Sequence, residues 1–169
     1  MKKYALSLLT LTMALSSGAA FAAGVGETAT EEVRITFAAP SSISHSITAA
    51  GVMEAGQVAM DTLLASGTVT TGDNVDKINV TFTNGATRPG GGNHISRTIT
   101  GESGEEIVVS LHADGATSTQ VYGNSSLIFG YSAPSSSFSY YLKMGSNQAT
   151  HTVKPDIYTV QVSAQRWES

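Results

Sequence analysis

The sequence contains no cysteine and few charged side chains. Of its 169 residues, 13% are Asp, Glu, Lys or Arg, and Cys is absent. A chain without cysteine has neither a disulfide nor a thiolate that could act as a nucleophile or bind a metal. If the protein is exported, its stability therefore depends on its core or on contacts with other chains.

Basic residues are scarce and do not cluster. The chain has nine Lys and Arg against thirteen Asp and Glu. Loss of Lys2 and Lys3 with an N-terminal signal would leave seven basic residues and a net charge of −6. Nucleic-acid binding needs a basic surface that follows the phosphate backbone. Nucleic acid is therefore not expected as a partner.

Long apolar runs are missing outside the N-terminus. There, two lysines precede an apolar run from Tyr4 to Leu15, and the small-residue pattern Ala20-Phe21-Ala22 follows. This is the layout of a secretory signal peptide, and the run is too short to span a bilayer. We expect residues 1–22 to be a signal peptide and the remaining 147 residues to be exported as one domain.

Sustained helical periodicity is also missing. Residues 23–169 contain 19 Ser and 18 Thr but only five Leu. Thr and Val favour strands, and Ser with Gly favours turns. Apolar side chains alternate along nine segments, which are 33–37, 43–49, 58–70 with a kink near 66–67, 77–83, 94–100, 105–113, 127–131, 138–144 and 157–167.

These segments predict an all-β, Ig-like sandwich. We expect a hairpin between 94–100 and 105–113, with Ile107, Val109 and Leu111 inward. A second pair should join 127–131 to 138–144, and residues 84–93 should form a mobile loop. After strand 157–167 too few residues remain for another strand.

Catalytic and metal-binding motifs are absent. The four histidines have no close spacing such as H-x-x-x-H, and no G-x-S-x-G elbow is present. The glycine run 90–92 lacks the Lys-Ser/Thr of a phosphate loop. We therefore expect no enzymatic activity, no metal and no cofactor; the histidines, expected as ordinary surface or half-buried residues, are His45, His94, His112 and His151.

The stretch after the signal changes character along its length. Residues 23–32 are Gly-rich and polar, and the following strand alternates and ends at Pro40, which lacks a backbone N–H. One face of the strand carries Val33, Ile35, Phe37 and Ala39. Such a terminal strand can pair in its own sheet or add to the exposed edge of another copy. The residues alone leave both possibilities open.

Two parts of the sequence resemble a known family. The run 33–41, followed by 43–49 and 51–56, resembles the start of the Saf-type N-terminal-extension pilins. These are subunits of chaperone/usher fimbriae, in the branch that contains the F1-like and Afa/Dr adhesins. Residues 154–162 resemble the family's closing strand, whereas 72–149 match only in strand pattern.

The resemblance implies an incomplete Ig-like antiparallel β-sandwich that lacks its last strand. In this family a periplasmic chaperone lends a strand, and at the outer-membrane usher the N-terminal extension of the next subunit replaces it. By this resemblance, residues 23–40 form the donor-strand extension and 41–169 the pilin domain. Val33, Ile35, Phe37 and Ala39 would then enter a groove whose edge carries Tyr158, Val160, Val162 and Ala164.

The function implied is that of a structural subunit of a cell-surface fimbria or polymeric adhesin, assembled by donor-strand exchange and mediating adhesion. Its partners would be neighbouring pilin subunits, in a homopolymer or a mixed fibre, the chaperone, the usher and a host-cell receptor. The alternative is a self-contained exported β-sandwich that binds a ligand or carbohydrate through Tyr140, Tyr141 or the 84–93 loop.

Size-exclusion chromatography of residues 23–169, produced without a chaperone, separates these two hypotheses. A subunit that lacks a strand exposes apolar surface and open sheet edges, so it should elute as oligomers or aggregates. A complete domain should elute as a monomer, and that result would favour the self-contained binding protein.

Overall fold

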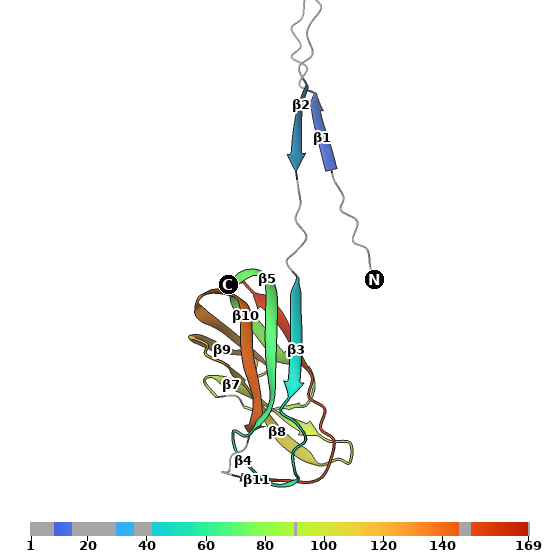
Figure 1. The fold of residues 1–169 in the computed structure, drawn as a ribbon, viewed down its shortest axis with the longest axis vertical. Coiled ribbons are helices and arrows are strands. Elements are labelled where there is room, and N and C mark those ends of the chain that lie inside the picture. Colours follow the sequence, from blue (N-terminus) through green and yellow to red (C-terminus); the bar gives the residue numbers. More distant parts are fainter. Residues whose placement is uncertain (1–8, 15–29, 36–41, 90, 146–149, 169) are drawn as a thin grey trace, which may run out of the picture. The chain divides into compact units, whose positions relative to one another are not determined.

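The computed structural model describes residues 9–14, 30–35, 42–89, 91–145 and 150–168 (Figure 1). Every regular element in these ranges is a β-strand. The chain divides into two compact units, Met1–Pro40 and Ser41–Ser169. Within the described ranges, no helix has the length and apolar character required to cross a membrane.

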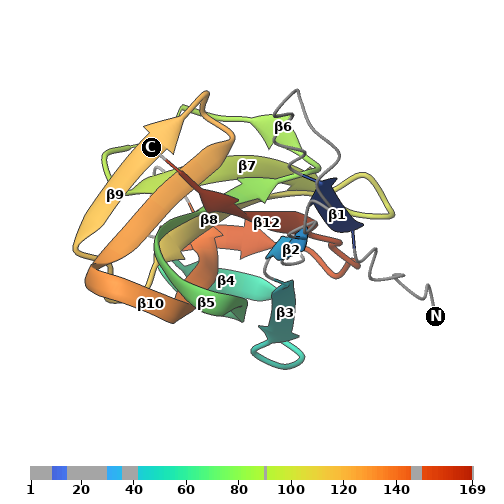
Figure 2. The same ribbon diagram turned by 90° about the horizontal axis from the view of Figure 1, so that it is seen from above.

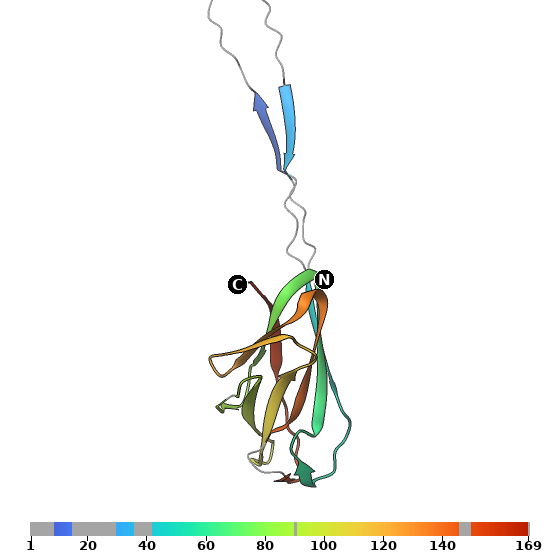
Figure 3. The ribbon, with the colours of Figure 1, turned by 90° about the vertical axis from the view of Figure 1, so that its left-hand side faces the viewer.

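The first unit contains one two-stranded antiparallel sheet. Strand β1 (Leu9–Ala14) pairs antiparallel with β2 (Thr30–Ile35) (Figure 3). In the register of this pair, Leu11 is the partner of Val33 and Leu9 is the partner of Ile35. Strand β2 includes the first part of the segment expected over 33–37. Phe37 and Ala39 lie outside the described residues, and the assignment of a signal peptide and a donor extension stays a prediction.

The second unit is built around an eight-stranded antiparallel sheet in the order β12-β5-β10-β8-β7-β6, with β3 also on β5 and β9 also on β10. A short sheet pairs β11 with β4. The strands are β3 (Ile43–Ala49), β4 (Gly56–Ala59), β5 (Leu63–Phe82), β6 (Ala86–Thr87), β7 (His94–Thr100), β8 (Glu106–Ala113), β9 (Ser118–Tyr122), β10 (Ser126–Gly145), β11 (Thr150–Val153) and β12 (Val162–Trp167).

Two long strands turn this sheet into a sandwich. Strands β5 and β10 have 20 residues each, and both curve from one layer into the other at one end of the domain (Figures 1 and 2). The first half of β5 pairs with β3 and the second half with β12. Because β5 folds over between its halves, β3 and β12 lie in different layers and run in opposite directions.

The core lies between the layers and comes from alternate residues of each strand. The predicted inward positions Ile107, Val109 and Leu111 are confirmed, since all three are buried. The Phe138 ring stacks on Tyr131 with 5.3 Å between ring centroids and meets Phe129 edge-on at 6.3 Å. Burial of such side chains stabilises a domain by about 1.5–3 kcal/mol each.

The predicted strand divisions are wrong in the bends. Segments 58–70 and 77–83 belong to β4 and the single strand β5, and the break falls next to Asp61, whose φ is 64°, not near 66–67. Segments 127–131 and 138–144 do not pair with each other, because both are parts of β10 and pair with β5. The serine-rich stretch between them keeps an extended backbone and forms no tight turn.

Short strands account for the other differences. Strand β6 lies inside the expected 84–93 loop and pairs with β7. Polar strands β9 and β11 have too little apolar alternation to be recognised. The expected last strand 157–167 enters the sheet only from Val162 onward.

Gly67 is required by the packing of Tyr140. The two residues are opposite each other across β5 and β10, and a Cβ on Gly67 would overlap the Tyr140 ring. The Tyr140 side chain is fully buried, and its hydroxyl is 2.6 Å from Nε2 of His45 on β3. The absence of a side chain at Gly67 therefore lets Tyr140 lie flat and reach β3.

We expect Gly67→Ala to lower the free energy of unfolding by about 1–3 kcal/mol, because overpacking forces the Tyr140 ring to move. Denaturant unfolding measures this change. Ser66→Ala, at an exposed neighbour on β5, is the matched control and should alter stability by less than about 0.5 kcal/mol. Equal stability of the two variants would contradict the close packing of Tyr140.

Candidate functional site: an apolar groove between two open strand edges

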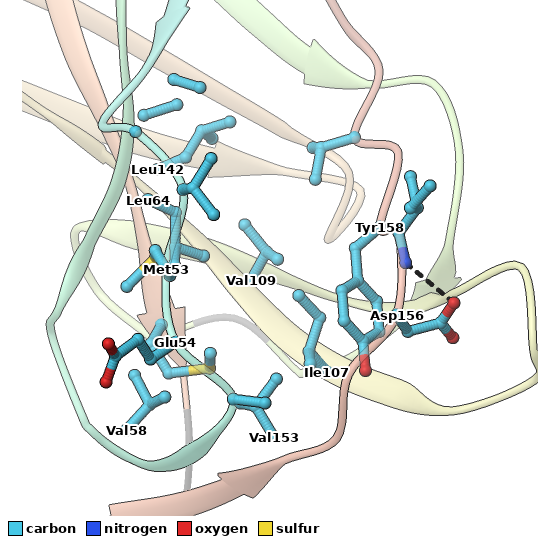
Figure 4. Close-up of a pocket in the computed structure, with 18 of the residues that line it drawn as sticks. Met53, Glu54, Val58, Leu64, Ile107, Val109, Leu142, Val153, Asp156 and Tyr158 are labelled. Carbon is cyan, nitrogen blue, oxygen red and sulfur yellow. Dashed lines mark hydrogen bonds between the residues drawn. The ribbon is translucent and has the colours of Figure 1, made fainter.

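A cavity of about 620 Å³ opens between β3 and the segment that leads into β12 (Figure 4). Its floor is the buried apolar core itself. Ile107 and Val109 contribute from β8, and Leu142 and Met144 from β10. The core of the sandwich is therefore open to the outside along this groove.

The first wall combines β3 with residues 50–55. Ile47 and Ala49 line the groove from the strand, and Val52 and Met53 continue the wall. Ile47 is 39% exposed, Met53 is 41% exposed, and Val52 is fully exposed. Exposed apolar side chains grouped along one cavity indicate a surface that a partner covers.

Among the described residues, the backbone of β3 is hydrogen-bonded along only one edge, the one that pairs with β5. Ala50 N–H donates to Leu64 O at 2.9 Å, and Gly72 N–H donates to Ser42 O at 2.8 Å. These two bonds flank β3 and determine which of its residues bond to β5. Because bonding alternates along an antiparallel strand, even-numbered residues of β3 bond to β5. The N–H and C=O groups that point away from β5, on the free edge, belong to Ile43, His45, Ile47 and Ala49.

The second wall, residues 154–161, is fastened on its outer side. The Asn84 amide donates to Thr159 O at 2.8 Å and accepts from Gln161 N–H at 2.9 Å. Thr83 N–H donates to Gln161 O at 3.0 Å. The intervening N–H and C=O groups of Tyr158 and Val160 have no hydrogen-bond partner among the described residues. This wall is therefore a second open edge.

A carboxylate fixes the base of the second wall. Asp156 accepts hydrogen bonds from Ser103 N–H at 3.2 Å and from Ile157 N–H at 2.8 Å. A hydrogen bond from the Ser103 side chain is the main reason that the Asp156 pKa lies below its usual value, and the N–H groups of Ile157 and Ser103 lower it further. Gly101 permits this approach, because a Cβ there would overlap the Asp156 carboxylate and crowd the Tyr158 ring.

The groove has the features of a binding site for an extended strand. Two open backbone edges flank an apolar floor, so a strand laid between them could form ladder hydrogen bonds while alternate side chains enter the core. Within the described ranges, no group of three or more His, Cys, Asp or Glu residues could hold a metal ion.

The structure describes all four predicted edge residues and two of the four predicted donor residues. Tyr158 and Val160 line the cavity, and Val162 and Ala164 continue in β12, half-buried against the core. All four predicted edge residues thus share one face of the chain. Of the predicted donor residues, Val33 and Ile35 lie in β2, and Phe37 and Ala39 lie outside the described residues.

Several groove residues were not predicted from the sequence. Met53 could have been found from the sequence, because it is an apolar residue beside turn residues. Asn84 and Gly101 could not, because they act through contacts with residues distant in sequence. For the alternative contact surface, the structure corrects one residue. Tyr140 is fully buried, because the inward face of β10 carries it, and it cannot contact a ligand at the surface. Tyr141 faces the other way and donates a hydrogen bond to Asp114 at 2.7 Å.

Several solved structures of fimbrial and adhesin proteins have a similar fold. A structure of enteroaggregative Escherichia coli AAF fimbriae, described with fibronectin binding and biofilm formation, matches with a TM-score of 0.60 and 15% identity over 76% of this chain and 87% of that chain. The HdaB minor tip subunit of the E. coli Hda pilus matches with a TM-score of 0.58 and 16% identity, covering 75% and 83% of the two chains.

The SafD adhesin of Salmonella also matches, with a TM-score of 0.58 and 17% identity over 73% of this chain and 83% of that chain. No family model matches the sequence, and no curated protein matches it significantly. At these identities the likeness shows the fold. The second unit is an all-β, Ig-like antiparallel sandwich of the kind found in pilus and adhesin subunits, as the sequence predicted.

We expect Asp156→Ala to release the base of the second wall. Amide hydrogen exchange at Ser103 and Ile157 should become faster, because both N–H groups lose their acceptor. Glu102→Ala removes a neighbouring acid that makes no such bond and is the control. Unchanged protection in Asp156→Ala would show that the carboxylate does not hold the wall.

The same contact has a defined pH dependence. Since folding lowers the Asp156 pKa below its ordinary value of 3.8, its contribution is present above that pH and is lost as pH falls through the folded-state value. The wild-type and Asp156→Ala proteins should therefore differ in exchange at neutral pH and converge in acid.

Proposed function

We propose that the protein is a structural subunit of a cell-surface fimbria or polymeric adhesin, and that its groove receives a strand from a neighbouring subunit. The observation that carries this proposal is the pair of open edges above an exposed core. An unpaired backbone group away from water is costly, and so is an uncovered apolar floor. One inserted strand would remove both costs.

The directions of the two walls favour a donor from another chain. A strand that completes an Ig-like sheet antiparallel to β12 runs parallel to β3, because β3 and β12 run in opposite directions. The residues just before β3 cannot do this within one chain. After such a strand, the chain would have to return along the full length of β3, about 23 Å for seven residues. Residues 40–42 span at most about 11 Å.

The segment 33–39 is the proposed donor. With a period of two, Val33, Ile35, Phe37 and Ala39 share one face, which would enter the groove, while Arg34 and Thr36 stay in water. Burial of Val, Ile and Phe contributes about 1.5–3 kcal/mol each. The main-chain bonds to Tyr158, Val160 and the free edge of β3 would add to this.

Assembly in this proposal follows the chaperone/usher route. After export through the periplasm, a chaperone strand would cover the groove, and the donor extension of the next subunit would replace it at the outer-membrane usher. The partners are further copies or related subunits, and for an adhesive fibre a host-cell receptor. The fimbrial identity of the matched structures supports this assignment, and none of the steps involves enzymatic chemistry.

A peptide-exchange experiment tests the donor assignment. The chaperone-bound subunit is mixed with a synthetic peptide of residues 27–41, and chaperone release is followed by native gel or fluorescence anisotropy. We expect the wild-type peptide to release the chaperone and Phe37→Ala to act at least about tenfold more weakly, because it loses the largest anchoring side chain.

Thr36→Ala is the matched control, since its side chain belongs to the face that stays in water, and it should behave like the unmodified peptide. Equal activity of the Phe37→Ala and unmodified peptides would mean that Phe37 is not an anchor. Absence of release by the unmodified peptide would refute the donor assignment as a whole.

A further inference from the structure

A second cavity, of about 450 Å³, lies on the outer face of β7 and β8. Along β8, Ile107 and Val109 point to the core, whereas Val108, Ser110 and His112 line this second cavity. Because successive side chains of a strand point to opposite faces, the cavity and the groove lie on opposite sides of β8. A strand in the groove would leave the cavity open.

Two imidazoles form one side of the cavity. His94 on β7 is directly opposite His112 on β8, and their rings are stacked with 4.9 Å between centroids and 17° between planes. Burial is the main cause that lowers the pKa of His112, and the charges of His94 and Lys143 lower it further, while Asp61 raises it. The cations around His112 oppose its protonation, and a neighbouring anion would offset that cost.

The Arg88 guanidinium lines the same cavity and has few hydrogen-bond partners among the described residues. Arg88 lines the cavity, and its one hydrogen bond among the described residues is long, 3.4 Å from Nη1 to the Thr98 hydroxyl. No carboxylate forms an ion pair with Arg88 in the described part of the chain. Arginine is the side chain best suited to bind carboxylate, sulfate or phosphate groups with two parallel bonds.

Two buried serines supply one more donor. The hydroxyls of Ser96 and Ser110 are 2.8 Å apart, and both residues are more than nine-tenths buried. One proton forms the bond between them. The second proton has no acceptor among the described residues, although buried hydroxyls nearly always find one. An acceptor inside the cavity would complete this pair.

We propose that this cavity binds an organic oxyanion, a carboxylate, sulfate ester or phosphate ester carried on a small polar molecule such as an acidic sugar. Arg88, His94, His112 and the serine pair are the donors. Met60, Pro89 and Val108 provide an apolar wall for the rest of the molecule. The cavity is many times the roughly 30 Å³ that one water occupies, which favours an organic ligand over a bare inorganic ion.

The charges around the histidines set the pH dependence. His112 faces His94 on β7, Lys143 on β10 and Asp61 before β5, and Arg88 lines the same cavity. A bound anion stabilises protonated imidazole, so binding takes up protons. Affinity should therefore increase as pH falls from 7.5 to 5.5.

Calorimetric titration of the mature chain, purified with its groove filled by chaperone or donor strand, tests this inference. The probes are glucuronate, glucosamine 6-sulfate, glucose 6-phosphate, inorganic sulfate and neutral glucose. We expect saturable binding of at least one organic oxyanion at pH 5.5, at least about fivefold weaker at pH 7.5, and none of glucose.

Three variants show where the probe binds. Arg88→Met should weaken binding at least about tenfold, because a charged donor is lost while the aliphatic stem is kept. Lys77→Met removes a cation that does not line the cavity and should have no effect. Asp61→Asn should tighten binding, since it removes the carboxylate in the cavity, and Asn tolerates the positive φ of that position.

The Asp61 variant also keeps the test independent of Arg88, should Arg88→Met fail to fold. Titration with Zn²⁺ alone distinguishes an anion site from a cation site, because Asp61→Asn would weaken Zn²⁺ binding at a cation site. The inference would be overturned by no saturable binding of the organic probes, by binding that Arg88→Met leaves unchanged, or by equal affinity for inorganic sulfate. None of these results bears on strand exchange in the groove.

Discussion

The structure depends on one unmet requirement, which is a hydrogen-bonding partner for two strand edges that face each other across an open core. In water, the free-edge N–H and C=O groups of β3 and those of Tyr158 and Val160 can be solvated, but the apolar floor between them cannot. A compact domain ordinarily covers such a floor with its own chain. Here the walls are held apart and in place, and the described residues leave the floor between them uncovered.

Much of the geometry serves to keep that gap open and regular. The fold-over of β5 places β3 and β12 in different layers, with the groove along the seam between them. Asn84 and Asp156 then bond the second wall from its outer side, so its inner groups stay available. Both residues satisfy backbone groups that β-ladder bonds would satisfy in a regular strand. The second wall therefore presents free N–H and C=O groups, as the edge of a sheet does, although residues 154–161 belong to no strand.

The sequence predicts those parts of the structure that local alternation determines. Strand β3 and the hairpin of β7 and β8 are found as expected, because apolar side chains recur along one face of each strand. Strands β5 and β10 are mispredicted at their bends, because Ser, Gly and Pro normally signal turns and here allow an extended chain to curve. Short polar strands such as β9 form by pairing with a neighbouring strand, and their own sequence gives no strand pattern.

In the candidate sites, too, local alternation predicts some features and misses others. The shared face of Tyr158 and Val160 follows from period two, whereas their departure from the ladder depends on Asn84, which is distant in sequence. The stacked histidines look scattered along the chain, yet they face each other in the predicted hairpin once its register is counted from the turn. The spacing of motifs along the sequence misses contacts of this kind, which a register calculation would find.

Only three residues stand between the proposed donor segment 33–39 and β3, and this has a mechanical consequence. In a fibre of such subunits, tension would enter each domain at the start of β3 and leave through the strand seated in its groove. In the proposed arrangement both elements would lie along the direction of pull, so their ladder bonds would be loaded together in shear and would have to break nearly at once. A fibre held by a single non-covalent strand per junction could then carry load without any covalent crosslink, which suits a chain that has no cysteine.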